Sequence, residues 1–316
     1  MLQMETSPAR SDRPSALLGI TLATALWGLS FVSTKALLRT LLPVQVAFMR
    51  HVIASVATLA VAVATRQSLK VRPSDMPRML AASIIGIPVY FYFENTGLLY
   101  LPAATASMIT ASTPAITAVM ETLYRGKRLP AWGWMGILVS AAGVALVVRA
   151  GAMEAAASRA GMDYFLKGAL MLLLSSLSWA VYTIVNRPII ARYSVFTVNS
   201  YQVPAATLVL AAASWLTGKP TPWADSLRAP NVLLNLLYLG VACSALSYGL
   251  YLHALRALGS TTVSSFINLV PVFGVLGSAA LLGEPLSAVQ LAGGVLVISG
   301  IFIVDASQRA TASTGS

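Results

Sequence analysis

Long apolar stretches alternate with short polar segments along the whole chain. A helix needs about 20 mainly apolar residues to cross a hydrocarbon layer about 30 Å thick. The pattern predicts such helices over residues 16–38, 44–65, 78–100, 103–124, 132–149, 164–187, 194–217, 231–252, 261–282 and 287–304. We therefore expect an all-α membrane protein with ten transmembrane helices.

The two halves of the chain resemble each other. Pro114 coincides with Pro271 when the sequence is shifted by about 157 positions, and Trp27 coincides with Trp179 at a shift of about 152. Each half holds five predicted helices, and an odd number of crossings inverts the second half relative to the first. Two inverted repeats that meet near the bilayer midplane are typical of transporters that alternate access to a central site.

Composition and charge agree with a membrane protein. The chain is 57% hydrophobic and only 10% charged, and its mean hydropathy is +0.76. The net charge of +11 would suit nucleic acid, but the Lys and Arg residues lie between the predicted helices. They concentrate in segments that a cytoplasmic N-terminus would place inside, so we expect both termini in the cytoplasm and no nucleic-acid partner.

These observations predict the domain organisation. It consists of a cytoplasmic tail (1–15), a first five-helix repeat (16–149), a linker (150–163), a second five-helix repeat (164–304) and a second cytoplasmic tail (305–316). The single cysteine, Cys243, excludes an intramolecular disulfide and is expected to pack as a small apolar residue.

Two tryptophans stand out because of their depth. Trp27 and Trp179 lie near the centres of the first and sixth predicted helices, whereas Trp normally gathers at the membrane interfaces. A buried indole N–H needs an acceptor from a cavity or a neighbouring helix. With Tyr90, Tyr182 and Tyr248 they predict a cavity that binds an apolar or aromatic small molecule; packing between helices is the alternative for any one of them.

Two opposite charges lie inside predicted helices. A charged side chain at the bilayer centre costs about 2.5–3.5 kcal/mol on insertion scales, so Arg50 and Glu94 are candidate functional residues. They either pair with each other or bind the two ends of a zwitterion, and the pair is favoured because an unpaired buried charge is costlier. A second hypothesis couples transport to protons through Glu94. Lys35 is expected to extend to the membrane surface.

Neutral polar residues complete the predicted site. Asn95 and Asn268 are expected to bind substrate, and Gln202, near the position that matches Arg50, is a further hydrogen-bonding candidate. Asn186 either serves the same purpose or ends its helix. The two histidines, His51 and His253, stand on different helices without clustered ligands, so we expect no metal site.

Prolines and glycines indicate how the helices bend and pack. Pro88, Pro114 and Pro271 lie near the middle of predicted helices and act as hinges or as fixed kinks, and their symmetric placement favours hinges. Small residues give the fifth and tenth helices smooth faces, including Gly136, Gly143, Gly293, Gly294 and Gly300. Packing within the chain is the favoured interpretation, with a homodimer as the alternative.

Enzyme motifs are weak. Gly28-Leu29-Ser30 with His253 would suit an intramembrane enzyme acting on lipid or peptide, but the two side chains are predicted at different depths. The chain has no nucleotide-binding or zinc-protease motif, so we expect neither an enzyme nor a cofactor. It also has no loop that resembles a channel filter.

One set of positions resembles a known family. It comprises Leu26-Trp27-Gly28, Arg50, the segment Leu101 to Ala106, Pro114 and Gly283-Glu284-Pro285-Leu286, and it resembles the EamA type of the drug/metabolite transporter superfamily over about residues 16–304. The resemblance implies a ten-helix carrier in the bacterial inner membrane, most often an exporter of amino acids or related metabolites. It also implies a cavity lined by helices one, three, four, six, eight and nine.

The resemblance leaves two points open. Lys127 stands where the second half has Glu284, so we expect Glu284 to start a helix or lie at an interface instead of binding an ion in both halves. The same aromatic residues and single carboxylate would also suit a multidrug efflux protein for lipophilic cations.

Overall fold

Helices form all the regular structure in the part of the chain that the computed structural model describes, residues 12–125, 129–157 and 161–314. In the first half they are α1 (Asp12–Leu37), α2 (Pro43–Ala64), η1 (Pro73–Asp75), α3 (Met76–Ile84), η2 (Ile85–Val89), α4 (Tyr90–Tyr100), α5 (Ala103–Thr110), α6 (Thr113–Arg125) and α7 (Ala131–Ala156). In the second half they are α8 (Met162–Ile190), α9 (Val195–Leu216), α10 (Trp223–Arg228), α11 (Pro230–Leu237), η3 (Tyr238–Leu246), α12 (Ser247–Ile267), α13 (Val270–Gly277), η4 (Ser278–Leu282) and α14 (Ala288–Thr314).

Nine helical stretches among these residues are long and apolar enough to cross a membrane, and one of them, Ala103–Tyr124, includes the break between α5 and α6. They correspond to nine of the ten predicted helices. The prediction of one helix over 261–282 is wrong, because α12 continues to Ile267 and a shorter apolar helix follows over Val270–Leu282. Pro271 explains the interruption, since it cannot donate the hydrogen bond that would continue α12.

Helix ends also differ from the prediction. α7 continues to Ala156, inside the predicted linker 150–163, and α14 continues to Thr314, inside the predicted tail 305–316. The linker begins with an Ala-rich segment, and alanine has the highest helix propensity. The predicted N-terminal tail lies mostly outside the described residues, and α1 begins at Asp12.

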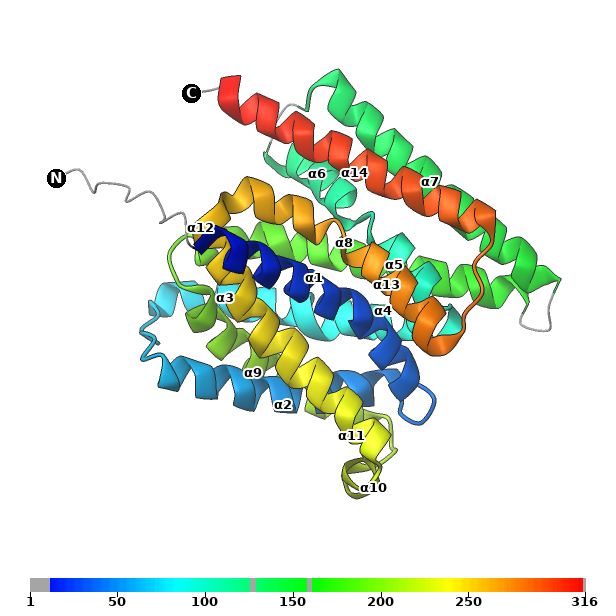
Figure 1. The fold of residues 1–316 in the computed structure, drawn as a ribbon. Helices are drawn as coiled ribbons and strands as arrows, with labels where there is room; N and C mark the ends of the chain where they lie inside the picture. The colour runs from blue at the N-terminus through cyan, green and yellow to red at the C-terminus, as the bar shows by residue number, and fades with distance from the viewer. Residues whose placement is uncertain (1–11, 126–128, 158–160, 315–316) are drawn as a thin grey trace.

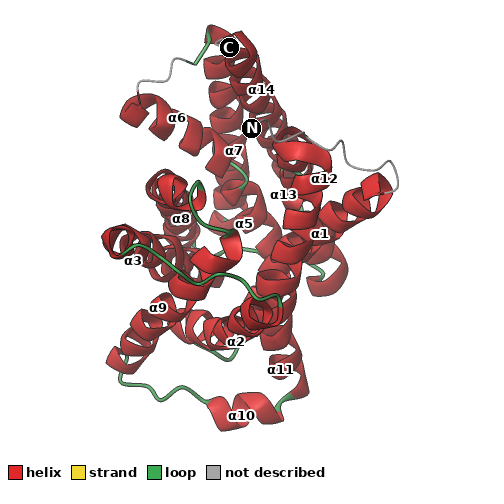
Figure 2. Cartoon of the chain, turned by 90° about the vertical axis from the view of Figure 1, so that its left-hand side faces the viewer, coloured by secondary structure: helices red, strands yellow, loops and turns green. Residues whose placement is uncertain are grey.

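The helices pack in pairs that join the two halves. α7 and α14 lie side by side along the upper edge of Figure 1, and α2 packs against α9. Viewed from the end, α1, α12 and α13 lie on one side, and α3 and α8 lie on the other (Figure 2). The largest buried apolar cluster includes Phe31, Leu98, Ile109 and Leu172, so the core lies where the two halves meet.

The α7–α14 pair is antiparallel and depends on glycine. A Cβ on Gly136 would lie 2.8 Å from the Gly300 carbonyl oxygen, and a Cβ on Gly143 would lie 2.6 Å from that of Gly293. Only glycine permits this approach of two backbones. The glycine faces are therefore buried against each other within one chain, and the homodimer stays a prediction.

Candidate functional site

Two helices are interrupted at equivalent positions of the two halves. α5 ends at Thr110 and α6 begins at Thr113, while α12 ends at Ile267 and α13 begins at Val270, 157 positions later in both cases. α5 packs against α13, so the broken helices meet in the interior. Discontinuous helices at corresponding positions are where transporters with internal repeats build their substrate sites.

Pro114 and Pro271 cause these interruptions. Each is the second residue of the helix that follows the break. Backbone N–H groups in the first turn of a helix have no acceptor within that helix, so proline can stand there without loss of a hydrogen bond. The sequence placed both near the middle of a continuous helix, and this detail is wrong. The Thr110 carbonyl, to which residue 114 would donate in a continuous helix, accepts a hydrogen bond from the Thr113 hydroxyl at 2.6 Å instead.

Pro88 lies in a different kind of irregularity. It is part of η2, one turn of π-helix, and a second π-helical segment, η3, begins 153 positions after the first. Such segments occur frequently at functional sites because they displace side chains from the regular helical face. The Ser178 hydroxyl donates to the Ile85 carbonyl at 2.7 Å, and the Tyr238 hydroxyl donates to the Leu26 carbonyl at 2.6 Å, so both segments are bonded to the other half.

Aromatic side chains gather between the irregular segments. The ring centroid of Trp179 lies 5.2 Å from that of Tyr90 and 5.0 Å from that of Tyr182. Trp27 lies 5.8 Å from Tyr248 in an edge-on contact. The hydroxyl of Tyr248 lies near enough to those of Tyr90 and Tyr182 for a charge on one to act on the others, which links the two groups.

Phe91 and Glu94 contact Tyr90, and Arg50 contacts Phe91. We call the whole group the central assembly: Trp27, Arg50, Tyr90, Phe91, Glu94, Trp179, Tyr182 and Tyr248. Six of the eight predicted substrate-binding residues therefore lie together. The buried indole of Trp27 finds its acceptor on a neighbouring helix, because its Nε1 donates to the Cys243 carbonyl at 3.0 Å. Phe91 joins the assembly through Arg50, a contact that no spacing in the sequence indicates.

Arg50 and Glu94 are both buried, with 6% of each residue exposed. They form no ion pair, so the favoured prediction of a direct pair is wrong: among the described residues, ion pairs join only Arg187 to Glu121, Arg192 to Asp75 and Arg309 to Asp305. Glu94 accepts a hydrogen bond from the Tyr90 hydroxyl at 2.5 Å, one helical turn away. The Arg50 guanidinium carbon lies 4.5 Å from the centre of the Phe91 ring.

A polar network borders the assembly on α8 and α9. The Gln202 side-chain amide donates to Asn186 Oδ1 at 2.8 Å, and the Asn186 amide donates to the Tyr182 hydroxyl at 3.0 Å. Tyr182 in turn donates to Gln202 Oε1 at 3.2 Å, which closes the ring of bonds. Asn186 lies inside α8 and does not end it. This network fixes the position of the Tyr182 hydroxyl.

The two remaining predicted residues lie apart. Asn95 is buried and its amide donates to the Pro43 carbonyl at 2.9 Å, at the start of α2. Asn268 lies in the break between α12 and α13, and no recorded contact joins it to the central assembly within the described residues. Adjacent positions on a helix face different directions, which explains why Glu94 and Asn95 separate.

Lys35 and Glu284 hold the turn between α4 and α5 from two sides. Lys35 donates to the carbonyls of Leu98 at 2.6 Å and Leu101 at 2.8 Å, so its ammonium group binds the turn that joins two membrane-spanning stretches. Glu284 accepts from the backbone N–H of Ala103 at 2.7 Å and from the Ser278 hydroxyl. The prediction of an interface role for Glu284 is confirmed. We call this arrangement the α4–α5 clamp.

The predicted serine and histidine do not form a catalytic pair. The Ser30 hydroxyl donates to the Trp27 carbonyl at 2.7 Å, and His253 is exposed beside Ser15. No group of three or more candidate metal ligands occurs in the described ranges.

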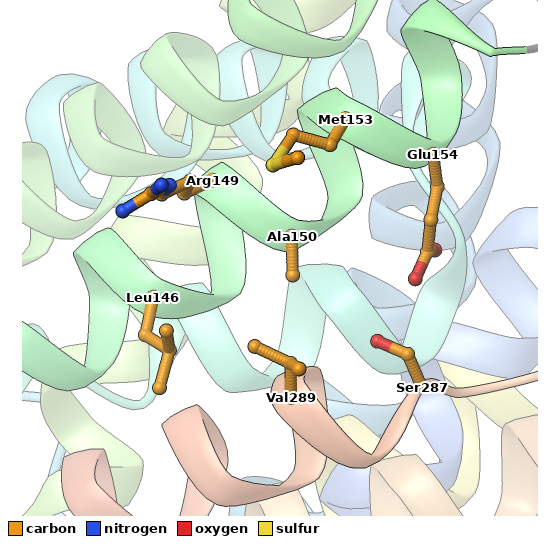
Figure 3. Close-up of a pocket in the computed structure, with 7 residues that line it drawn as sticks. All are labelled: Leu146, Arg149, Ala150, Met153, Glu154, Ser287 and Val289. Carbon is orange, nitrogen blue, oxygen red and sulfur yellow. The ribbon is translucent and has the colours of Figure 1, made fainter.

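A separate pocket of about 370 Å³ lies between α7 and the start of α14. Arg149, Met153 and Glu154 line it from α7, and Ser287 and Val289 line it from the opposite side (Figure 3). Since it contains none of the predicted substrate-binding residues, it lies outside the central assembly.

The apolar helices, the breaks at equivalent positions and the buried polar assembly define a multi-pass membrane protein of the transporter class. The model of the EamA-like transporter family matches residues 14–149 and 166–305. The chain belongs to this family.

Relatives extend over nearly the whole chain. An "Uncharacterized transporter" of Archaeoglobus fulgidus is 27% identical, covering 95% of this chain and 99% of the relative. A "Probable amino-acid metabolite efflux pump" of Salmonella typhimurium is 26% identical, covering 89% and 92%. A "Probable terminal-alkyne amino-acid exporter" of Streptantibioticus cattleyicolor is 26% identical, covering 81% and 82%.

A solved crystal structure of another protein superposes with a TM-score of 0.65, covering 94% of this chain and 99% of that one at 20% identity. At this identity the likeness shows the fold alone.

Proposed function

We propose that the protein exports amino acids or related metabolites by alternating access, with the central assembly as its substrate site. The observation that carries this proposal is the pair of helix breaks at equivalent positions, with the aromatic and charged side chains gathered beside them. The relatives named as amino-acid exporters and efflux pumps support the substrate class.

The inverted repeat is part of this proposal, and contacts across the two halves support it. The Gln45 side-chain amide donates to the Pro220 carbonyl at 3.2 Å, and the Thr197 hydroxyl donates to the Ser68 carbonyl at 2.8 Å. A shift of 152 positions converts one contact into the other. Both join the start of one helix to the loop beyond the end of the other, as expected of antiparallel partners.

The orientation in the membrane belongs to the same proposal. α1 begins and α14 ends at the same end of the molecule (Figure 1), in agreement with two cytoplasmic termini. The α4–α5 clamp would then close the extracytoplasmic end.

Efflux from proteoliposomes tests the function. Vesicles that contain the purified protein and a mixture of labelled amino acids should release at least one of them faster than protein-free vesicles. Trp179→Ala should lower that rate at least tenfold because it removes the ring between Tyr90 and Tyr182. Trp215→Ala is the matched control, since Trp215 is 80% exposed near the end of α9.

Two results would contradict the proposal. Release of every amino acid at the protein-free rate would remove the substrate class, and release of a lipophilic cation such as tetraphenylphosphonium would then favour multidrug efflux. Equal losses in Trp179→Ala and Trp215→Ala would show that the central assembly is not the site.

A further inference from the structure

Arg50 is a buried cation without a protein partner. Its side chain makes no ion pair and no hydrogen bond within the described residues, and its Nε is enclosed with no acceptor. Most buried charges in proteins are paired, because removal from water is costly. The buried Nε–H of this guanidinium therefore lacks an acceptor, and the N–H groups of its two more accessible Nη atoms donate to no described residue.

The surroundings hold Arg50 in place without satisfying it. The Phe91 ring lies 4.5 Å away and attracts the charge, but a ring offers no conventional acceptor for the N–H groups. The backbone of η3 passes close to α2 at this point: a Cβ on Gly240 would lie 3.0 Å from the Arg50 carbonyl oxygen. The Phe91 ring therefore packs on the guanidinium, and η3 packs against the backbone from which the Arg50 side chain extends.

The nearest carboxylate in the assembly is otherwise engaged. Glu94 receives the Tyr90 hydroxyl and interacts with Arg50 only through space, at a distance beyond that of an ion pair. The charge of Arg50 also acts on the hydroxyl of Tyr248 across the assembly. Arg50 thus lies among the aromatic residues of the proposed substrate site, beside Phe91 and near Tyr248.

We propose that Arg50 binds the carboxylate of the transported solute. A guanidinium and a carboxylate match each other as a planar, two-point hydrogen-bonded pair. Binding would supply the missing acceptor, and the rings of Tyr90, Trp179 and Tyr248 would surround the rest of the solute. This inference rests on the proposed export of amino acids, and it identifies the chemical group that the site selects.

The same charge discriminates against other ligands. An amine or a lipophilic cation without a carboxylate brings a second positive charge toward Arg50 in a medium of low dielectric constant, where repulsion is strong. A solute whose carboxylate is converted to a carboxamide keeps its shape but loses the charge that Arg50 requires.

The test compares each amino acid with its own carboxamide. Binding of both forms to the purified protein is measured by isothermal titration calorimetry, and their efflux is measured from proteoliposomes. The wild type should bind the free acid at least tenfold more tightly than the carboxamide. Arg50→Gln should bind the acid at least tenfold more weakly than the wild type and lose the preference, while Arg50→Lys should retain part of it. Arg149→Gln, on the outer face of α7, is the matched control.

Circular dichroism and size-exclusion chromatography test whether Arg50→Gln folds. If it does not, the comparison of acid with carboxamide is made with Arg50→Lys. Equal binding of acids and carboxamides by the wild type, or unchanged discrimination in Arg50→Gln or Arg50→Lys, would overturn the inference and leave export intact. Absence of binding and efflux for all amino acids would overturn the proposed function as well.

Discussion

At the scale of single residues, the structure separates glycines that permit close packing from those that do not. Gly143 faces the backbone of α14, where an added Cβ would lie 2.6 Å from both Gly293 O and Val297 N. Gly249 also lies inside a helix, yet nothing lies within 4 Å of the position its Cβ would occupy. Glycine is therefore required for close helix packing at position 143 of α7 but not at position 249 of α12.

Gly143→Ala should destabilise the protein by about 1–3 kcal/mol, because neither backbone can move without separating α7 from α14. Gly249→Ala is the control and should leave stability unchanged or raise it by up to about 1 kcal/mol, since alanine favours the helix. Thermal unfolding of both variants in detergent measures the difference. Equal melting temperatures would mean that the two helices separate at no cost.

At the scale of elements, the α4–α5 turn depends on charged side chains from distant helices. Lys35 binds the carbonyls at the end of α4, and Glu284 binds the amides at the start of α5. Helix ends leave these groups without intrahelical partners, and the bilayer provides no water to replace them. The turn itself consists only of Leu101 and Pro102. Lys35 on α1 and Glu284 after η4 thus supply the hydrogen bonds that its backbone groups need.

Glu284→Ala should destabilise the protein by about 1–3 kcal/mol, because it leaves the Ala103 amide unsatisfied, while the Ala104 amide keeps the Ser278 hydroxyl at 3.2 Å. Glu284→Gln keeps an amide oxygen as acceptor and should lose less. The midpoint of thermal unfolding measures both effects. If both variants were as stable as the wild type, the carboxylate would have no role in capping α5.

At the scale of the whole molecule, the two halves are not in equivalent states. Lys35 binds the turn after α4, but its counterpart 152 positions later, Arg187, pairs with Glu121 at 2.8 Å. The corresponding position of the second half, just after Leu255, lies inside α12, which continues to Ile267 without a turn. If the halves exchange conformations, Arg187 should leave Glu121 and bind carbonyls near Leu255, while Lys35 releases its own.

Spin labels at Tyr124 and His253, both exposed and on α6 and α12, can follow this exchange. In a background with Cys243→Ser, addition of a transported amino acid should produce a second, shorter distance between the labels. Arg187→Met should reduce the population with the shorter distance. A single distance, unaffected by substrate and by the variant, would contradict an exchange between two states.

Much of the architecture could be predicted because the bilayer imposes strong rules on the sequence. Nine of the ten predicted helices have a counterpart among the described residues, and the matching of Pro114 with Pro271 identified the helices that break. Partners were harder to predict. The direct pair of Arg50 with Glu94 was wrong, because Glu94 accepts from the Tyr90 hydroxyl instead. The backbone carbonyls that bind Lys35 could not be predicted, because they lie on a helix 63 positions later in the chain.

The sequence by itself determined the membrane class, the internal repeat and most residues of the central assembly, because hydrophobic length and periodicity are local properties of the chain. Only the tertiary structure decided which side chains meet: the Phe91 ring beside Arg50, Glu284 at the start of α5 and the closed network of Tyr182, Asn186 and Gln202. These contacts depend on how separate helices cross, and each crossing is fixed by packing between residues far apart in the chain.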